Sequence, residues 1–404
     1  MSQTKHSLIN FIVHGAGQIV NLLAPFIVMP YIIKVCGVEN WGKIGVATSL
    51  FIVLCLLIEF GSNLIGVKEV SAYRNATNYL KKYIGTLYQY RMFSTIILLG
   101  ICIFTFLILN VEAVFYFGLL SLVAQLFNPI WFFQGLEDFK TINKIIIISK
   151  VLYVVLVFIL VRKTEDYVYV VGILGFANTL VYAYYYSKIP KVFSTSQKRL
   201  LSFVKKNQAI VISNFAITFY SNAPVFIISI FLGDFYTGIY KISDMIITVF
   251  RSYLGVFFNV SYPRYCYLLQ EKWSEGIRYI RKITGFNILF LGFVTTLLFL
   301  LYIVGIDYFN IETSLKEGLS LSKYLCFLPI IIALNIPYYQ TLLYFHKTKT
   351  LVNFSLFGAM AMFVLGTLLT WKFHLEGTIV SIYIVEMFIT LAMFTKGKPL
   401  LNAK

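Results

Sequence analysis

Charged residues are scarce in this sequence: they make up 13% of its 404 residues, whereas hydrophobic residues make up 59%. Because an ordinary soluble domain carries about 25% charged residues, this chain has too few to cover a surface that faces water. Intrinsic disorder is excluded as well, since disordered segments are poor in apolar and aromatic side chains. Together these features indicate a protein that crosses a membrane many times.

Among the charged residues, acidic ones are scarcer than basic ones: 17 Asp and Glu stand against 34 Lys and Arg, which gives a formal net charge of +17. A strongly basic chain is often a nucleic-acid-binding protein, but that function needs basic residues on a folded soluble surface and a matching motif. Here the basic residues lie in short islands between long apolar runs. We therefore expect no nucleic-acid partner.

Pairs of metal-binding residues are also missing. The five cysteines are single residues in apolar stretches without a Cys-x-x-Cys pair, which gives no support for a disulfide framework or a zinc site. The four histidines are too scattered for a metal cluster, and no Walker A sequence is present. We expect no metal, no cofactor, no direct use of ATP and no catalytic residues, so the sequence predicts a transporter and not an enzyme.

Long apolar runs are what the chain has in abundance. A membrane-spanning helix needs about 20 mostly apolar residues, and the sequence contains twelve such runs. They lie at about 8–33, 43–66, 84–109, 113–136, 142–161, 167–188, 207–232, 236–262, 283–304, 322–343, 350–371 and 377–395. The predicted fold class is an all-α polytopic membrane protein with twelve transmembrane helices.

Basic residues alternate between the loops of this arrangement. The two termini and the even-numbered loops hold 25 Lys and Arg, the odd-numbered loops hold 8, and Arg251 lies inside a span. Because Lys and Arg are enriched on the cytoplasmic side of membrane proteins, both termini are predicted to be cytoplasmic.

Weak internal similarity divides the chain into two halves. A Gly-x4-Gly pattern follows the first span at Gly37 and recurs after the seventh span at Gly233. We expect an N-terminal six-helix lobe at 1–188, a basic cytoplasmic linker at 189–206 and a C-terminal six-helix lobe at 207–404. Repeats with an even number of spans are parallel, so a pseudo-twofold axis along the membrane normal is expected to relate the lobes.

Polar side chains form stripes along spans one, seven and eight. Helical periodicity places the polar residues of each span within an arc of about 80–100°. Because polar groups inside a bilayer usually face a bundle interior or a cavity, the stripes are candidate walls of a substrate cavity. The alternative is that amides and hydroxyls only hold helices together. The candidate cavity residues, some from other spans, are Arg251, Lys241, Asp244, Asn259, Asn21, Gln18, Asn214, Asn222, Asn128 and Arg91.

Arg251 is the leading candidate, since a charge inside a span is costly. One interpretation is a buried ion pair with Asp244, two turns earlier on the same helix. The other is a cation that lines a water-filled cavity and receives an anionic group of the substrate. Lys241 is either a second such group or a side chain that extends to the interface. Arg91 is either a cavity cation or an interfacial anchor.

Four titratable residues are candidates for ion coupling. Glu59, Asp244 and Glu386 are carboxyl groups inside spans, where environments suited to proton exchange near neutral pH occur. His14 joins them because imidazole titrates in that range. The alternative is structural: carboxyl groups hydrogen-bonded near helix ends and a satisfied interior histidine.

Two segments carry a resemblance to a known family. Residues 128–138 read Asn-Pro-Ile-Trp-Phe-Phe-Gln-Gly-Leu-Glu-Asp, and residues 37–42 read Gly-Val-Glu-Asn-Trp-Gly. Together with Asn21 and Pro25 they resemble the polysaccharide exporter family, the Wzx-type O-antigen flippases of the multidrug/oligosaccharidyl-lipid/polysaccharide exporter superfamily.

The resemblance implies two six-helix lobes around a central cavity. It implies a cargo of undecaprenyl pyrophosphate that carries an O-antigen repeat unit, moved by alternating access from the cytoplasmic to the periplasmic leaflet of the bacterial inner membrane. Arg251, with Lys241, would receive the pyrophosphate, and coupling to an ion gradient is a hypothesis. The implied partners in lipopolysaccharide biosynthesis are the lipid-linked oligosaccharide, membrane lipids, an O-antigen polymerase and a chain-length regulator.

Two other functions fit the residues less well. A cation-coupled multidrug exporter of the same superfamily would need an acidic, aromatic cavity, whereas the stripe of span eight is balanced or basic. An O-unit polymerase or ligase would normally present a long outer loop, and the longest one here, about 305–321, is short.

Overall fold

The computed structural model describes the backbone of most of the chain. The described ranges are 2–74, 76–192, 197–304 and 313–402, and within them the side chains of 2–16, 18, 197–198, 206, 304 and 402 fall outside the description. Across these ranges the chain forms helices and no strands. The all-α class predicted from the sequence is therefore confirmed.

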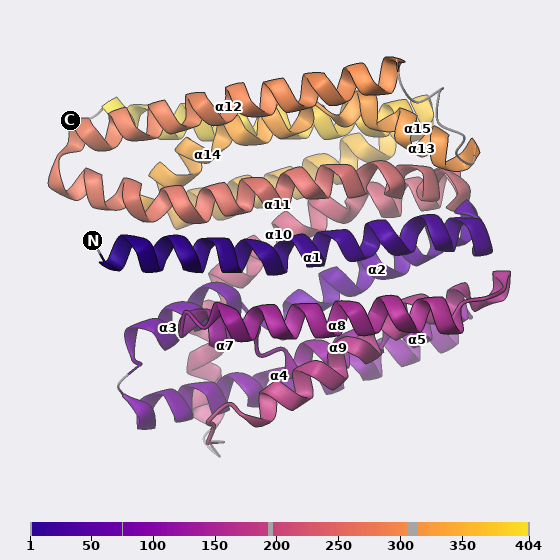
Figure 1. The fold of residues 1–404 in the computed structure, drawn as a ribbon, viewed down its shortest axis with the longest axis horizontal. Coiled ribbons are helices and arrows are strands. Elements are labelled where there is room, and N and C mark those ends of the chain that lie inside the picture. Colours follow the sequence, from indigo (N-terminus) through magenta and orange to yellow (C-terminus); the bar gives the residue numbers. More distant parts are fainter. Residues whose placement is uncertain (1, 75, 193–196, 305–312, 403–404) are drawn as a thin grey trace. The chain divides into compact units, whose positions relative to one another are not determined.

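The chain divides into two compact units, which are described separately. The first unit is Met1–Phe215 and the second unit is Ala216–Lys404. The helix α10, Gln197–Leu232, begins within the stretch 189–206 that was expected to be a linker and continues from the first unit into the second (Figure 1). The predicted lobe boundaries stay a prediction.

The first unit consists of long helices interrupted by short ones. Its central packing is that of α1 along α8, α6 on α9, and α8 on α9. The elements are α1 (Ser2–Cys36), α2 (Val38–Glu59), the π-helix η1 (Ser62–Gly66), α3 (Val67–Ala72), α4 (Thr77–Leu109), α5 (Ala113–Gly118), α6 (Leu120–Phe127), α7 (Ile130–Gly135), α8 (Phe139–Leu160), the 3-10 helix η2 (Thr164–Val168), α9 (Tyr169–Ser187) and the beginning of α10.

The second unit has fewer and longer helices. Here α14 packs on α15, and α11 packs on both α12 and α13. The elements after α10 are α11 (Asp234–Glu271), α12 (Trp273–Val304), α13 (Thr313–Leu325), α14 (Leu328–Tyr344) and α15 (Thr348–Asn402).

Several runs expected to be single helices are interrupted, including 43–66, where α2 ends at Glu59 and η1 begins at Ser62. The run 113–136 is divided into α5, α6 and α7, with a break at Asn128 and Pro129. Proline has no backbone N–H to continue the ladder, and its ring disfavours helical geometry in the residue before it. The run 322–343 contains the junction of α13 and α14, where the axes bend by 42°.

Helix α15 is a hairpin of two antiparallel helices. Phe373 and His374 have non-helical backbone angles, and His374 has a φ of 53°. The hydroxyls of Thr370 and Thr378 lie 2.7 Å apart, whereas eight residues of continuous helix would rise about 12 Å. Farther from the turn, the rings of Phe357 and Phe388 stack with centroids 4.5 Å apart, which requires the chain to reverse direction.

Gly37 and Gly233 each form a one-residue connection between two long helices. Gly37 joins α1 to α2 with φ 86° and ψ 160°, and Gly233 joins α10 to α11 with φ 87° and ψ −179°. This region of backbone space is essentially open only to glycine. The Gly-x4-Gly similarity in the sequence thus corresponds to the same turn in both units.

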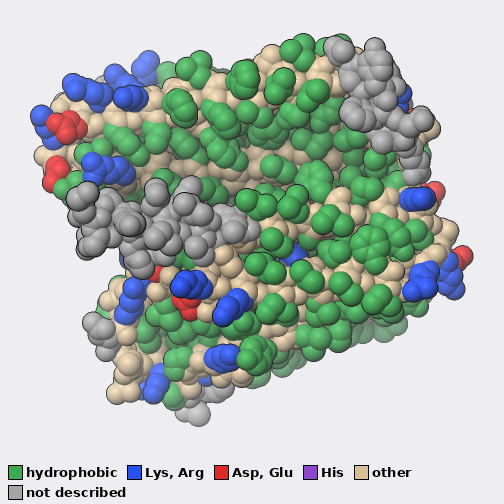
Figure 2. All heavy atoms as spheres, in the orientation of Figure 1, with side chains coloured by type: hydrophobic (Ala, Val, Ile, Leu, Met, Phe, Trp, Pro, Cys, Tyr) green, Lys and Arg blue, Asp and Glu red, His purple; other side chains and the backbone are tan. Residues whose placement is uncertain are grey.

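The surface is that of a protein embedded in lipid. Ten helices in the described ranges are long and apolar enough to cross a membrane, or eleven if α13 and α14 form one bent span. Large apolar side chains are exposed, among them Ile230 at 77% and Leu289 at 75%. Figure 2 shows hydrophobic side chains along the helix flanks and Lys and Arg mostly toward the helix ends. The chain is a multi-pass membrane protein, and the exact count of twelve spans stays a prediction.

Candidate functional site

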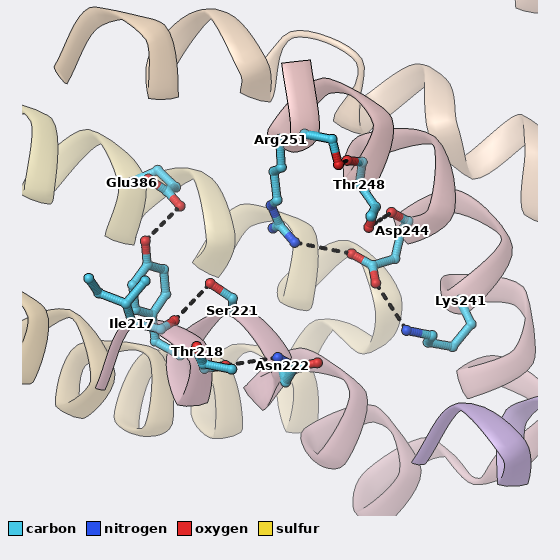
Figure 3. A network of polar contacts seen from close by, with 11 residues as sticks. Ile217, Thr218, Ser221, Asn222, Lys241, Asp244, Thr248, Arg251 and Glu386 are labelled. Carbon is cyan, nitrogen blue, oxygen red and sulfur yellow. Dashed lines mark hydrogen bonds and ion pairs between the residues drawn. The ribbon is translucent and has the colours of Figure 1, made fainter. Parts of the chain in front are cut away.

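The polar stripe of α11 lies on one face of this helix in the second unit. Its members follow one another at spacings of three and four residues, which places their side chains on one side. They are Lys241, Asp244, Thr248 and Arg251. Asp244 lies between the two cations (Figure 3): its Oδ2 accepts a hydrogen bond from Lys241 Nζ at 3.1 Å, and its Oδ1 accepts one from Arg251 Nη1 at 3.4 Å.

This cluster carries two positive charges on one carboxylate. The side chains of Asp244 and Lys241 are 12% and 14% exposed, whereas that of Arg251 is 30% exposed. A guanidinium has five N–H donors, and the bond to Asp244 uses one of its nitrogens. Arg251 therefore makes the ion pair with Asp244 that the structural interpretation predicts. It also keeps accessible N–H donors, which the cavity interpretation requires.

A second carboxylate approaches Arg251 from α15. Glu386 is 5% exposed, and its Oε1 accepts a hydrogen bond from Tyr220 Oη of α10 at 3.4 Å. Arg251 interacts electrostatically with both Asp244 and Glu386, and Figure 3 shows it between them. Three helices, α10, α11 and α15, therefore converge on this arginine.

Some polar side chains of α10 in the second unit donate hydrogen bonds to backbone carbonyls of their own helix. Ser221 Oγ donates to the carbonyl of Ile217 at 2.8 Å, and Asn222 Nδ2 donates to the carbonyl of Thr218 at 2.9 Å (Figure 3). Such bonds to the residue four positions earlier satisfy a donor locally. What Asn222 can offer a substrate is mainly its side-chain oxygen.

The remaining predicted site residues do not join this cluster. Asn259 is exposed, two turns beyond Arg251 on α11. The side chains of Gln18 and His14 lie outside the described residues. Four further candidates belong to the first unit: Asn21, Asn128, Asn214 and Arg91. Their role in a cavity stays a prediction.

Arg91 is completely buried within the first unit. Its exposure is 0%, its Nη1 donates to the carbonyl of Asn128 at 2.8 Å, and its Nη2 donates to Ser62 Oγ at 2.6 Å. The acceptors lie where α6 and α2 end, and a cation is favourable at a helix C-terminus because backbone carbonyls there lack partners. Complete burial does not fit an interfacial anchor.

Glu59 lies next to Arg91's surroundings, at the break between α2 and η1. It is the last residue of α2 and is followed by Phe60 and Gly61, with φ of 49° and 72°, and then by η1. Glu59 is 8% exposed, accepts a bond from the Asn63 backbone N–H at 3.4 Å and interacts electrostatically with Arg91. The buried cation thus has a buried counter-charge.

The segment 128–138 fixes the surroundings of Arg91. Trp131 is fully buried, and its ring centroid lies 5.8 Å from the Arg91 guanidinium carbon. A Cβ at Gly66 of η1 would lie 2.7 Å from Trp131 Cε3, so only glycine allows this close packing. Asp138 then caps α8 by accepting a bond from the Thr141 N–H at 3.1 Å. In this structure the segment acts in packing.

Sequence reasoning missed several polar groups. Tyr220 lies off the polar stripe of α10 when residues are placed at 100° intervals, so periodicity gives no signal for it. Gln125, Asn178 and Tyr182 line a cavity of about 170 Å³ within the first unit. Asn178 and Tyr182 lie one turn apart on α9, whereas Gln125 lies on α6, and only the packing of α6 on α9 brings Gln125 to the other two.

The family of the chain follows from comparison with known proteins. A model of the family described as "Polysaccharide biosynthesis protein" matches residues 7–269, about two thirds of the chain. The chain belongs to this family. The membership expected from segments 37–42 and 128–138 is thereby confirmed.

Curated relatives align with almost the whole length of this chain. A protein of Shigella dysenteriae named "Putative O-antigen transporter" is 25% identical over 98% of this chain and 100% of its own length. A protein of the same name from Escherichia coli (strain K12) is 24% identical over 94% of both chains.

Solved structures share the fold of this family member at low sequence identity. The lipid II flippase MurJ in an inward closed conformation is 12% identical, with a TM-score of 0.70 over 97% of this chain and 87% of its own. An inward-facing multidrug resistance transporter of the MATE family is 13% identical, with a TM-score of 0.62 over 97% and 98%. At these identities the similarity concerns the fold.

Proposed function

We propose that this protein is a flippase that moves an undecaprenyl-pyrophosphate-linked oligosaccharide, an O-antigen repeat unit, from the cytoplasmic to the periplasmic leaflet of the bacterial inner membrane. The family and two full-length relatives named as O-antigen transporters support transport of a lipid-linked polysaccharide. The structural observation that carries the proposal is Arg251: a cation inside a membrane helix that is balanced by Asp244 and still 30% exposed.

The chemistry of the α11 cluster suits a pyrophosphate group. Arginine offers a planar fork of donors that matches phosphate oxygens, and lysine adds a compact positive charge. Without cargo, Asp244 holds both cations. When a pyrophosphate binds Arg251, Asp244 keeps only its ion pair with Lys241. Binding of a proton or another cation to Asp244 is then coupled to binding of the cargo.

Coupling to an ion gradient is part of the proposal. Asp244 and Glu386 flank Arg251 and are the proposed carriers in the second unit. Glu59 is the proposed carrier in the first unit because it is 8% exposed and lies at a helix break. His14 is a further proposed carrier. An O-antigen polymerase and a chain-length regulator are the proposed partners, and both termini are proposed to be cytoplasmic.

Export of cationic drugs is the second candidate function, because multidrug transporters share the fold. The α11 cluster counts against it, since a cationic drug would meet Lys241 and Arg251 around a carboxylate that is already paired.

Deletion of the gene followed by lipid extraction tests the function. We expect lipid-linked O-units to accumulate on the cytoplasmic side of the inner membrane and surface O-antigen to disappear, both reversed by the wild-type gene. A deletion strain that displays normal O-antigen, or that becomes drug-sensitive without accumulating O-units, would contradict the flippase.

A further inference from the structure

A groove opens on the second unit between α12, α14 and α15, near the C-terminus. Two adjoining cavities of about 490 and 760 Å³ form it, and both are lined by Arg281 and Leu401. The smaller one continues along the flank of α12 to Ile288, and the larger one opens around the first turns of α12 at Trp273.

The inner part of the groove is mostly apolar, with the Thr284 hydroxyl as a polar group in its lining. Ile288, Leu334, Pro337, Tyr338 and Phe394 line it, and the last two pack edge to face with ring centroids 5.2 Å apart. Gly285 lies on the same wall, and a Cβ placed on it would meet no atom within 4 Å. The wall of α12 is therefore open at this point, and its chemistry suits a hydrocarbon chain.

The mouth of the groove is basic. Arg278, Arg281 and Lys282 line the larger cavity, Lys398 lines the smaller one, and all four are exposed. None of the residues that line either cavity is acidic, and within the described ranges no ion pair engages these four side chains. Glu275, on the first turn of α12, is paired with Lys272 at 3.0 Å. Glu275 also interacts electrostatically with Arg278, but this carboxylate is shared with Lys272, so the mouth keeps an excess of positive charge.

We propose that this groove holds an anionic phospholipid of the leaflet that contacts the C-terminus, with its phosphate at the basic mouth and one acyl chain along the Gly285 wall. Charge complementarity favours this occupant, because an anionic headgroup gains about a factor of five in affinity for each nearby Lys or Arg. The site lies apart from the α11 cluster and does not depend on the proposed transport function.

Native mass spectrometry of the purified full-length protein tests this site. The detergent-solubilised protein is given dioleoyl phosphatidylglycerol, dioleoyl phosphatidylcholine or undecaprenyl phosphate at equal concentration. We expect the wild type to retain phosphatidylglycerol in preference to the other two. The variant R278Q/R281Q/K282Q removes three charges from the mouth and is expected to bind phosphatidylglycerol about a hundredfold more weakly.

A second variant tests the contribution of the lipid acyl chain separately from that of the headgroup charge. Gly285→Leu keeps every cation and adds a side chain where the protein leaves open space, so it is expected to abolish retention without loss of the fold. The matched control K68Q/K140Q/K144Q removes three exposed cations of the first unit and is expected to bind as the wild type does. Wild-type retention in Gly285→Leu, an equal loss in the control, or preferential retention of undecaprenyl phosphate would overturn the proposal.

Discussion

Gly37 and Gly233 adopt the same backbone conformation, with φ of 86° and 87°, although 196 positions separate them in the sequence. Each is the single residue between two membrane helices. Ideal Cβ atoms at both positions would meet no atom within 4 Å, so space for a side chain does not explain the glycines. The backbone angles do, and the turn that the two glycines share corresponds to the Gly-x4-Gly similarity in the sequence.

Gly37→Ala and Gly233→Ala are each expected to destabilise the protein by about 1–3 kcal/mol, the cost of holding alanine in this region of backbone space. Thermal unfolding of the purified protein measures the loss. Gly100→Ala is the control: this glycine also has open space, but it lies within α4 and has no positive φ. We expect the control to be neutral or slightly stabilising, and a loss equal to that at Gly37 would contradict the backbone explanation.

Arg251→Ala is expected to reduce surface O-antigen at least about tenfold, since a hydrogen bond to a charged group contributes about 1.5–3 kcal/mol. Arg251→Lys keeps the charge, loses the planar fork and should restore part of the display. The measurement is O-antigen display at equal membrane abundance. Ser252→Ala, on the next position of α11, removes only a hydroxyl bonded to the Thr248 carbonyl and should behave as the wild type. Normal display in both Arg251 variants would remove Arg251 from the mechanism.

Arg91→Met is expected to lower stability by at least about 1.5–3 kcal/mol, because it removes the charged hydrogen bonds to the Asn128 carbonyl and Ser62 Oγ and leaves Glu59 as an isolated buried charge. Adding Glu59→Gln removes that isolated charge and should recover part of the loss. The test is a double-mutant cycle measured by thermal unfolding. If the two changes are simply additive, the electrostatic interaction between them contributes nothing to the fold.

The turn in α15 predicts the sidedness of the C-terminal part. In a protein without its five native cysteines, a cysteine at His374 should react with a membrane-impermeant thiol reagent in cells with a permeabilised outer membrane. A cysteine at Lys398 should react only after the inner membrane is opened. The side chains of His374 and Lys398 are both exposed, so a difference in labelling would report the side of the membrane and not burial within the protein. Labelling of both from the same side would show that α15 does not cross the membrane twice.

Glu112, in the connection between α4 and α5, gives a prediction about pH. Partial burial acts to raise the pKa of its carboxyl, but hydrogen bonds from Lys43 Nζ at 2.7 Å and Tyr167 Oη at 2.7 Å outweigh it and hold the pKa below its ordinary value of 4.5. A lowered pKa in the folded state stabilises the fold above pH 4.5, and this contribution is lost as the pH falls through the lower value.

The expected size of this effect is small, at most about 1 kcal/mol, because Glu112 is 45% exposed and surface ion pairs contribute little. The difference in melting temperature between the wild type and Glu112→Gln should be present at pH 6 and shrink below pH 4.5. A difference that grows as the solution becomes more acidic would contradict the assignment.

Local pattern accounts for much of what could be predicted from the sequence. The stripe on α11 was found because Lys241, Asp244 and Arg251 follow one another at helical spacing, and the ion pairs among them are local to one helix. The apolar runs predicted the membrane helices because their length is set by the bilayer.

Contacts between helices could not be predicted in the same way. Tyr220 and Glu386 are 166 residues apart and meet only through packing of α10 and α15. The burial of Arg91 depends on two helix ends, and the break after Glu59 lies inside a run that reads as continuous and apolar at 43–66. No proline marks that break, and its sequence signal is only Gly61 followed by Ser62 and Asn63.

The tight turn at Phe373 and His374 has a consequence for biosynthesis. The two halves of α15 are held together from Thr370 to Thr378, which leaves almost no loop to be carried across the bilayer between them. With the C-terminus on the cytoplasmic side, as proposed, the charged groups that cross are Lys372 and Glu376. The last two apolar segments are therefore suited to enter the membrane as a preformed pair, after synthesis of the whole hairpin.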